Sequence, residues 1–442
     1  MRGRLLCLAL VGLFATGAVV GCGVPAPKPV LFPLLTGKPG PVAARLSVTQ
    51  FRDLQPDVQA AAFAAAKDVH GGAALLHGGN IGIRSVVRSG HVIRTAPATG
   101  QYPAEVAAVD ARSATELYGS AVGSRLALRG WVVMSATSAS LFGARAGDYL
   151  QVWTWTNRRI APFYVAAVVP DTSVPAEITM STTTAAGIGF YRPTSVQLYG
   201  YPSEAAIDQA LESHGLPRVD ARVTRGGGSP TPDSTLSLAV TKAKLGQFWY
   251  VPNSNGSITV DPAWVAANVV HYHFSGIPIS AWCDKFVAPG IQGALNEIAA
   301  SGLSGAIDVA NTNTYGGCYG PREVRASGGT TGGNLSRHTW AMAIDINTSE
   351  NPMGAVPTMD CRVVRIFRKW GFAWGGNFTT PDGMHFEWVG QNRSQIAYPS
   401  RYCPNIITPT ASAASVNGAG AGAPPPPPPG TVSMQLEPQG DE

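Results

Sequence analysis

Charged residues are scarce in this sequence, and cysteines are few. Asp, Glu, Lys and Arg make up 13% of its 442 residues, and the net charge is +5. A charge excess this small argues against nucleic acid as a partner, because proteins that bind it carry strongly basic surfaces. The six cysteines include no CxxC pair, which argues against a structural zinc knuckle.

Long apolar runs are also absent, except for Leu5 to Val20 near the start. This run follows two arginines and is too short for a stable membrane span, which indicates a secretory signal. It ends in Val19-Val20-Gly21-Cys22, which resembles a bacterial lipobox, whose cysteine receives a lipid. We therefore expect an exported lipoprotein, anchored to the cell membrane through Cys22 and facing the cell wall. Ordinary signal cleavage and secretion is the alternative.

Apart from Cys7 and Cys22, the cysteines lie between residues 277 and 403 and are Cys283, Cys318, Cys361 and Cys403. An even number outside the cytosol indicates two disulfides. Of the three possible pairings we favour Cys283 with Cys318 and Cys361 with Cys403, because sequential pairing ties the segment near residue 320 and the C-terminal end to the core. Each loop closure would add about 3 to 4 kcal/mol.

Composition divides the chain into segments. With 45% apolar residues it can bury two or three cores, and its glycines and prolines are partly gathered in linkers. The predicted segments are a signal peptide with lipobox at 1–22, a Pro-rich tether at 23–45, an extracytoplasmic domain at 46–224, a linker and lead-in at 225–276, a catalytic domain at 277–403, and a disordered Ala/Gly/Pro-rich tail at 404–442.

Residues 46–224 are predicted to form a domain of mixed strands and helices. Alternating or apolar runs predict strands at 126–134, 148–155 and 162–169, and Ser203 to His214 reads as a helix capped by Ser203 and ended by Gly215. Residues 141–148 and 196–199 resemble extracytoplasmic domains of transporter permeases. No catalytic constellation occurs here, so a recognition or spacer role is expected.

The residues that suggest chemistry lie in two short stretches. In the first, a strand is predicted from Ala341 to Asn347. Met342, Ile344 and Ile346 form its apolar face and alternate with smaller or polar residues, so Asp345 points away from that face. His338 lies just before that strand, where a loop can bring its ring back.

The second stretch begins with the turn Pro381-Asp382-Gly383 and continues as a predicted strand over 384–389, in which His385 and Glu387 share the polar face. Two imidazoles and a carboxylate are the ligand set of a catalytic zinc site, in which the fourth position is left to water.

These stretches resemble a zinc peptidase family that contains the D-alanyl-D-alanine carboxypeptidases of vancomycin resistance and the L-alanyl-D-glutamate endopeptidases of phage lysins. The family pattern is SxHxxGxAxD followed by DxxHFE, and the matching residues are Ser336, His338, Ala343, Asp345, Asp382, His385 and Glu387. Ala341 stands where the family usually has Gly. The resemblance covers roughly residues 277–403.

The resemblance implies a role for each matched residue. His338, Asp345 and His385 would hold one zinc ion, and Asp382 would be the general base that takes a proton from the attacking water. Arg322, in the segment Tyr319-Gly320-Pro321-Arg322, would stabilise the oxyanion. Three further residues have supporting roles: Glu387 would orient a ligand imidazole, Ser336 would bind substrate or support His338, and Trp374 would line the cleft.

The fold expected for the catalytic domain is α+β, with a small antiparallel sheet and flanking helices. Apolar spacing predicts helices at 290–301 and 359–370, which would pack on the apolar face of the sheet and leave the cleft open to solvent. By the resemblance, this fold group also includes lysostaphin-type peptidases and the hedgehog signalling domain. The mixed N-terminal domain would precede it.

The predicted function is a zinc-dependent peptidase of the D-alanyl-D-alanine carboxypeptidase type, acting on the stem peptides of peptidoglycan. An endopeptidase acting on the same polymer is the first alternative. The second is a cell-wall binding protein that keeps zinc without turnover, as in hedgehog, and the presence of Asp382 argues against it.

Overall fold

The computed structural model describes residues 45–49, 54–97, 99–154, 159–189, 192–217, 223–226, 231–253, 255, 257–309, 315–324 and 335–405. The predicted signal peptide with Cys22, nearly all of the Pro-rich tether and the tail beyond residue 405 lie outside these ranges. None of the helices within them is long and apolar enough to cross a membrane.

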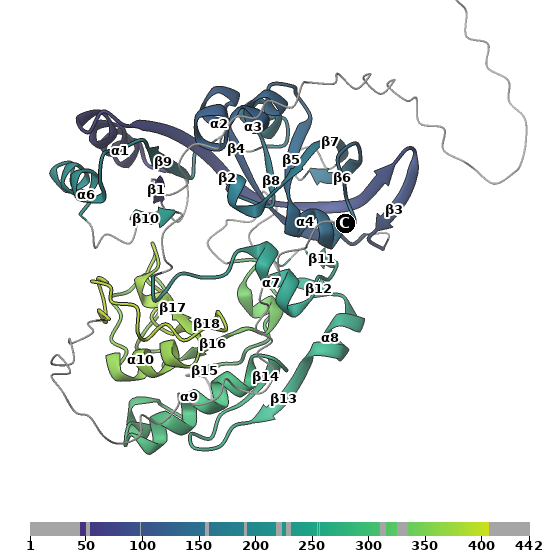
Figure 1. Ribbon diagram of the computed structural model, residues 1–442. Coiled ribbons are helices and arrows are strands. Elements are labelled where there is room, and N and C mark those ends of the chain that lie inside the picture. The colour runs from purple at the N-terminus through teal and green to yellow at the C-terminus, as the bar shows by residue number, and fades with distance from the viewer. Residues whose placement is uncertain are drawn as a thin grey trace, which may run out of the picture. The chain divides into compact units, whose positions relative to one another are not determined.

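Ten strands form the sheet of the N-terminal region (Figure 1). They are β1 (Arg45–Thr49), β2 (Gly72–Arg88), β3 (His91–Thr95), β4 (Tyr102–Val109), β5 (Trp131–Ser135), β6 (Tyr149–Thr154), β7 (Arg159–Val169), β8 (Ile178–Ser181), β9 (Ser195–Tyr199) and β10 (Val223–Gly226). Their order is β10-β1-β9-β2-β4-β8-β5-β7-β6, and β3 pairs with β2.

Six of these strands close into a barrel, because β6 at the end of the order pairs back with β2. Closure leaves no free edges on β2, β4, β8, β5, β7 and β6. The barrel interior holds the apolar side chains of Ile83, Val106, Val132, Leu150 and Val165. The sequence predicted mixed strands and helices in this region but not a barrel.

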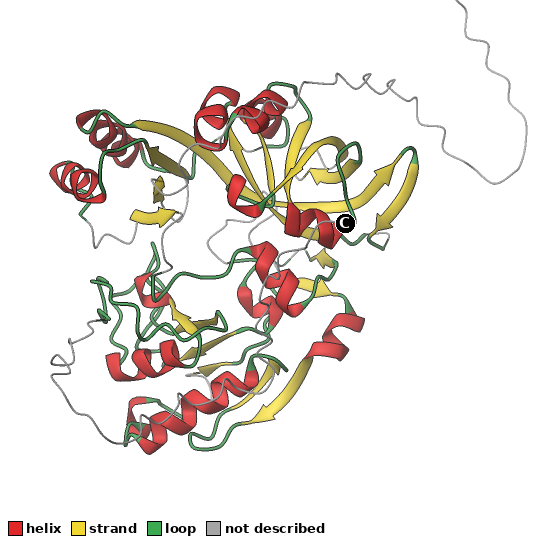
Figure 2. Cartoon of the chain, viewed as in Figure 1, coloured by secondary structure: helices red, strands yellow, loops and turns green. Residues whose placement is uncertain are grey.

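Helices cover parts of this sheet (Figure 2). They are α1 (Pro56–Asp68), α2 (Ala111–Tyr118), α3 (Ser120–Leu126), α4 (Ala136–Phe142), α5 (Thr182–Ala186) and α6 (Glu204–Ser213). The predicted helix at 203–214 is confirmed as α6, since the Ser203 hydroxyl accepts from the Ala206 N–H at 3.2 Å and Gly215 follows with a φ of +80°. The predicted strand at 126–134 is correct only from Trp131, because Leu126 is the last residue of α3.

The predicted linker contains ordered elements, namely α7 (Leu238–Leu245), β11 (Tyr250–Pro252), β12 (Ile258–Val260), α8 (Pro262–Asn268) and β13 (Val269–His273). Leu238, Leu245 and Trp264 belong to the same hydrophobic core as the residues of the predicted catalytic domain. That core therefore begins within the predicted linker, well before residue 277.

The C-terminal region contains a four-stranded antiparallel sheet in the order β15-β16-β18-β17. Its elements are β14 (Ser280–Asp284), which pairs with β13, then α9 (Ala288–Ala300), β15 (Tyr315–Gly316), β16 (Ala343–Ile346), α10 (Cys361–Lys369), β17 (Phe372–Trp374) and β18 (His385–Trp388). The two predicted helices are α9 and α10. Phe367 of α10 stacks on Phe386 of β18, with ring centroids 4.2 Å apart, so α10 covers the apolar face of the sheet as expected.

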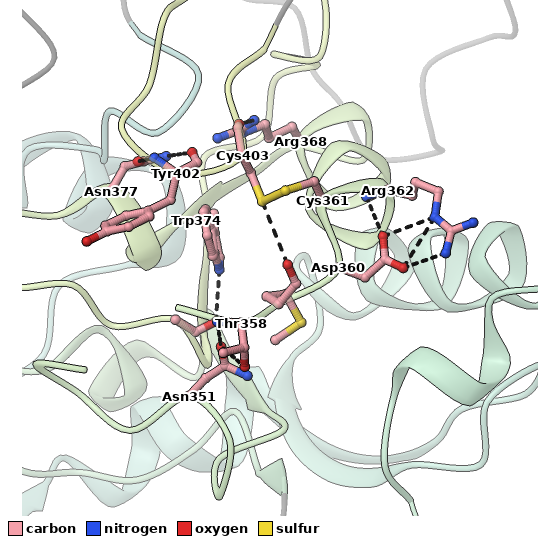
Figure 3. The surroundings of a disulfide bond; sticks show 12 residues. Asn351, Thr358, Asp360, Cys361, Arg362, Arg368, Trp374, Asn377, Tyr402 and Cys403 are labelled. Atoms are coloured by element: carbon pink, nitrogen blue, oxygen red, sulfur yellow. Dashed lines mark hydrogen bonds and ion pairs between the residues drawn. A yellow bond between two sulfur atoms is a disulfide. The ribbon is translucent and has the colours of Figure 1, made fainter. Parts of the chain in front are cut away.

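Both disulfides have the favoured pairing, Cys283 with Cys318 and Cys361 with Cys403. The first joins β14 to the segment that leads to Arg322. The second joins the first residue of α10 to the C-terminal end, and Figure 3 shows it beside Asp360, which caps α10 by accepting from the Arg362 N–H at 2.8 Å.

Candidate metal centre

Three side chains from two stretches of the sequence converge at the small sheet. His338 comes from a 3-10 helix (Arg337–Trp340), Asp345 from β16 and His385 from β18. Asp345 Oδ1 lies 3.2 Å from His338 Nε2 and 3.0 Å from His385 Nδ1. The donor atoms of all three lie within 4.8 Å of one another, which is close enough for a single metal ion.

The strand register explains how Asp345 and His385 meet. In the antiparallel pair β16–β18, Asp345 is opposite His385 and Ala343 is opposite Glu387, so all four share one face. Ile344 and Phe386 form the opposite, apolar face and are fully buried. The predicted alternation is therefore confirmed for these strands.

Ala341 has a different position from the one expected. It does not belong to the strand but follows the 3-10 helix as its C-cap, in the left-handed region with φ +51°. A residue with a Cβ pays about 1 to 2 kcal/mol for this conformation, whereas glycine adopts it freely. This explains why the family pattern has Gly at this position.

His338 is held in one orientation by backbone groups. Its Nδ1 lies 3.2 Å from the carbonyl oxygens of both Gly317 and Cys318, so it must carry the proton and donate. Its Nε2 is thereby left as the atom that faces Asp345. Ser336 caps the 3-10 helix by accepting from the His338 N–H at 3.3 Å, so it supports His338.

His385 uses its two ring nitrogens differently. Nδ1 faces Asp345, and Nε2 lies 3.7 Å from Glu387 Oε2. Burial alone would lower the pKa of His385, but its hydrogen bond to Asp345, the nearby carboxylate of Glu387 and the charges of Asp345 and Asp382 outweigh this and raise it to about 10. A metal that binds here must therefore displace a proton from the ring.

Asp345 is ionised at neutral pH. Burial on its own would raise its pKa, but the charges and hydrogen bonds of His338 and His385 hold the pKa far below the usual range. The side chain of His338 is 3% exposed, that of Asp345 13% and that of His385 10%. The candidate ligands are therefore more enclosed than the predicted open cleft implies.

Asp382 lies in the turn just before β18. Its N–H donates to the Gly375 carbonyl at 2.9 Å, and its own carbonyl accepts from the His385 N–H at 3.1 Å. The carboxylate atom Oδ1 is buried and accepts no hydrogen bond from any described residue. Burial raises the pKa of Asp382, and the charge of Asp345 adds to the rise against the opposing effect of His385.

The turn that carries Asp382 is fixed by β17 and the residue after it. Trp374 Nε1 donates to the Gly383 carbonyl at 2.9 Å, and a Cβ on Gly375 would lie 2.6 Å from the Asp382 carbonyl oxygen. Trp374 is fully buried. The expectation that it lines a cleft is therefore wrong, and it supports the Asp382 turn from behind.

Arg322 lies alongside the segment that carries His338. Its carbonyl accepts from the Ser336 N–H at 3.0 Å, and its Nη1 donates to the Gly320 carbonyl at 3.2 Å. Its positive charge offsets a small part of the rise in the pKa of Asp382. Arg325, the other arginine of this loop, lies outside the described residues.

Sequence reasoning did not foresee that Glu387 is buried and paired. Its side chain is 5% exposed, and its Oε1 lies 3.2 Å from Arg337 Nε. Arg337 is next to His338 in sequence, but no spacing rule shows that it reaches β18.

The donor set fits a zinc ion. Two imidazole nitrogens and one carboxylate oxygen are the ligands of catalytic zinc sites, which keep a position for water. Such a water needs a partner, and the buried Oδ1 of Asp382 accepts no hydrogen bond within the described part of the chain.

Comparison with known proteins supports the resemblance for the C-terminal part. Residues 329–388 match the family model described as D-alanyl-D-alanine carboxypeptidase, so this segment is similar to that peptidase family. No curated protein matches the chain.

Two solved structures are similar at a low level. The periplasmic region of MacB from Actinobacillus actinomycetemcomitans is 13% identical with a TM-score of 0.26, and the match covers 41% of this chain and 88% of that one. A domain of a putative permease protein from Porphyromonas gingivalis is 13% identical with a TM-score of 0.24, covering 40% and 82%. Similarity at this level carries no functional argument.

Proposed function

We propose that this protein is a zinc-dependent peptidase of the D-alanyl-D-alanine carboxypeptidase type that hydrolyses the stem peptides of peptidoglycan. The observation that carries the proposal is the convergence of His338, Asp345 and His385 next to the buried carboxylate of Asp382. The family match over residues 329–388 supports the substrate class.

The zinc ligands would be His338 through Nε2, Asp345 through its carboxylate and His385 through Nδ1. When bound, zinc supplies Lewis acidity, which polarises the substrate carbonyl and lowers the pKa of the attacking water. The orientation of each ligand is fixed by its neighbours. The carbonyls of Gly317 and Cys318 hold His338, and Glu387 faces the far nitrogen of His385.

Asp382 would act as general base and then as general acid. Its carboxylate takes a proton from the attacking water and returns it to the amine that leaves. A pKa raised by burial brings the group nearer to neutral pH, where a proton carrier works in both directions.

Arg322 would stabilise the negative charge that develops on the carbonyl oxygen during attack. The charge of the guanidinium acts on the Asp382 carboxylate, and the Arg322 backbone is joined to the ligand segment through Ser336. A fixed positive charge in a largely buried site acts strongly on such a charge.

We also propose that the protein is exported and anchored to the membrane through a lipid on Cys22. The two disulfides support an oxidising compartment. In cells that express Cys22→Ser, the protein should leave the membrane fraction for the medium or remain an unprocessed precursor. Unaltered membrane retention with normal processing would refute the anchor.

The products of muropeptide digestion test the function. Purified protein with zinc should remove a terminal D-alanine from pentapeptide muropeptides, seen by mass spectrometry, while cross-linked dimers stay intact. Splitting of the dimers without loss of D-alanine would identify an endopeptidase instead.

The variant Asp382→Ala tests the general base, and it should keep zinc and lose turnover. The exposed residue Asp57 in α1 supplies a matched control, Asp57→Ala, that should keep both zinc and turnover. If the zinc-loaded wild-type protein leaves all muropeptides unchanged, the peptidase proposal is wrong, and the alternative of a cell-wall binding protein that keeps zinc without turnover remains.

A further inference from the structure

A row of three side chains leads away from the metal centre. His385 faces Asp345 with Nδ1, and Glu387 Oε2 lies 3.7 Å from Nε2 of the same ring. On the other side of Glu387, Oε1 lies 3.2 Å from Arg337 Nε, and the side chains of Glu387 and Arg337 are 5% and 20% exposed. Glu387 is therefore placed between a candidate ligand and a guanidinium.

Arg337 is itself held in place. Its Nη2 donates to the Leu236 carbonyl at 2.8 Å, so one guanidinium has two fixed contacts, on Leu236 and on Glu387. Its backbone carbonyl accepts from the Ala341 and Met342 N–H groups at the end of the 3-10 helix. A planar guanidinium that meets two partners at once cannot be replaced by a lysine ammonium without losing one of them.

The anchor of Arg337 is also fixed. Leu236 lies two residues before α7, and Lys242 of α7 is buried, donates to the Pro103 carbonyl at 2.8 Å and pairs with Glu177. The Leu236 carbonyl therefore belongs to a segment that is tied to β4 and to the residue before β8.

Arg337 holds the Glu387 carboxylate in place. Its Oε1 accepts no hydrogen bond of ordinary geometry from any described residue, and the Arg337 guanidinium, with Nε 3.2 Å away, is the cation that faces this oxygen. A buried carboxylate that loses its cation turns toward water or toward another partner. In both cases the contact that orients the His385 ring is weakened.

We propose that Arg337 is a positioning residue of the metal centre, which fixes Glu387 so that Glu387 orients His385 with Nδ1 toward the metal. The inference deepens the proposed function and rests on its zinc site.

Zinc affinity of the full chain, measured by competition with a chelator, tests the proposal without any substrate. Arg337→Met should weaken zinc binding about 10- to 100-fold, the range typical of lost contacts behind a ligand, and Glu387→Gln should do the same. Arg337→Lys should lose less, because it keeps the charge. Arg362→Met removes an exposed arginine that pairs with Asp360 and should leave zinc affinity unchanged.

The double variant separates positioning from a general loss of structure. If Arg337 acts through Glu387, Arg337→Met with Glu387→Gln should bind zinc no more than about twofold more weakly than either single variant. Losses that multiply in the double variant, or wild-type affinity in Arg337→Met, would overturn the proposal. Should Arg337→Met fail to fold, wild-type affinity in Arg337→Lys together with wild-type affinity in Glu387→Gln would overturn it as well.

The two hypotheses fail differently. Wild-type protein that binds zinc but leaves muropeptides intact contradicts the proposed function and leaves the role of Arg337 standing. Active protein whose zinc affinity is indifferent to Arg337 contradicts only the positioning role.

Discussion

Lys242 and Glu177 form a buried ion pair, with Nζ and Oε1 2.5 Å apart and side chains that are 0% and 1% exposed. The pair is fully supported by hydrogen bonds, since Lys242 also donates to the Pro103 carbonyl and Glu177 accepts from the Ser138 hydroxyl and the Glu105 N–H. It joins α7, which belongs to the core of the C-terminal region, to strands of the barrel.

Removing the cation of this pair should strongly destabilise the protein. Lys242→Met leaves Glu177 buried and uncompensated, so we expect the free energy of unfolding to fall by about 3 to 5 kcal/mol, measured by urea denaturation of the full chain. The double variant Lys242→Met with Glu177→Gln should recover much of the loss.

A matched control is available at the surface. Lys369 pairs with Glu297 at 2.8 Å but is 46% exposed, so Lys369→Met should cost no more than about 1 kcal/mol. If Lys242→Met and Lys369→Met lower the free energy of unfolding equally, burial does not increase the contribution of the Lys242 ion pair to stability.

Asp284 should make stability depend on pH. Its Oδ1 accepts from the Phe286 N–H at 2.8 Å, whereas Oδ2 is buried and accepts no hydrogen bond from a described residue. Burial raises the pKa of Asp284 from 3.8 to about 6. The folded state therefore binds more protons than the unfolded state between about pH 4 and 6, and stability falls as pH rises through this window, by about 2 to 3 kcal/mol in total.

The variant Asp284→Asn isolates this effect, because the amide keeps the Oδ1 acceptor and cannot ionise. The free energy of unfolding of Asp284→Asn minus that of wild type should be larger at pH 7.5 than at pH 4. The increase should be the same, about 2 to 3 kcal/mol. A stability difference that stays constant between pH 4 and 7.5 would contradict the account of a buried, unpaired carboxylate.

The candidate ligands should decide the metal content. Metal analysis of the purified protein should find about one zinc per chain, and His338→Ala or His385→Ala should lose it, because two remaining ligands bind too weakly. His271→Ala changes an exposed histidine of β13 and serves as the control that should keep zinc. Unchanged zinc in both ligand variants would refute the site.

The sequence predicted the parts of the site that depend on local periodicity. Alternation in β16 and β18 put Asp345, His385 and Glu387 on one face, and the strand register then places Asp345 opposite His385. The left-handed conformation of Ala341 was missed because an alternating pattern extends as readily to residue 341 as to 343.

Long-range contacts were beyond the same reasoning. Closure of the barrel depends on β2 pairing with β6, more than sixty residues of chain apart at their starts, and periodicity within a strand says nothing about its partners. The burial of Trp374 was also missed, since a Trp before a glycine pair fits a wall of a cleft as well as a core. Its hydrogen bond to the Gly383 carbonyl decides for the core.

Arg322 should act mainly on the transition state. A guanidinium aimed at the developing oxyanion strengthens its interaction as negative charge grows, so Arg322→Ala should lower kcat about 100-fold or more while KM changes little. Zinc content should stay intact, because the side chain of Arg322 is not a ligand and its backbone contacts to Ser336 and Thr339 survive the substitution. Arg325→Ala is the control from the same loop and should be nearly silent. If Arg325→Ala proves damaging and Arg322→Ala silent, the oxyanion role belongs to Arg325, and the electrostatic effect of Arg322 on Asp382 has no part in turnover.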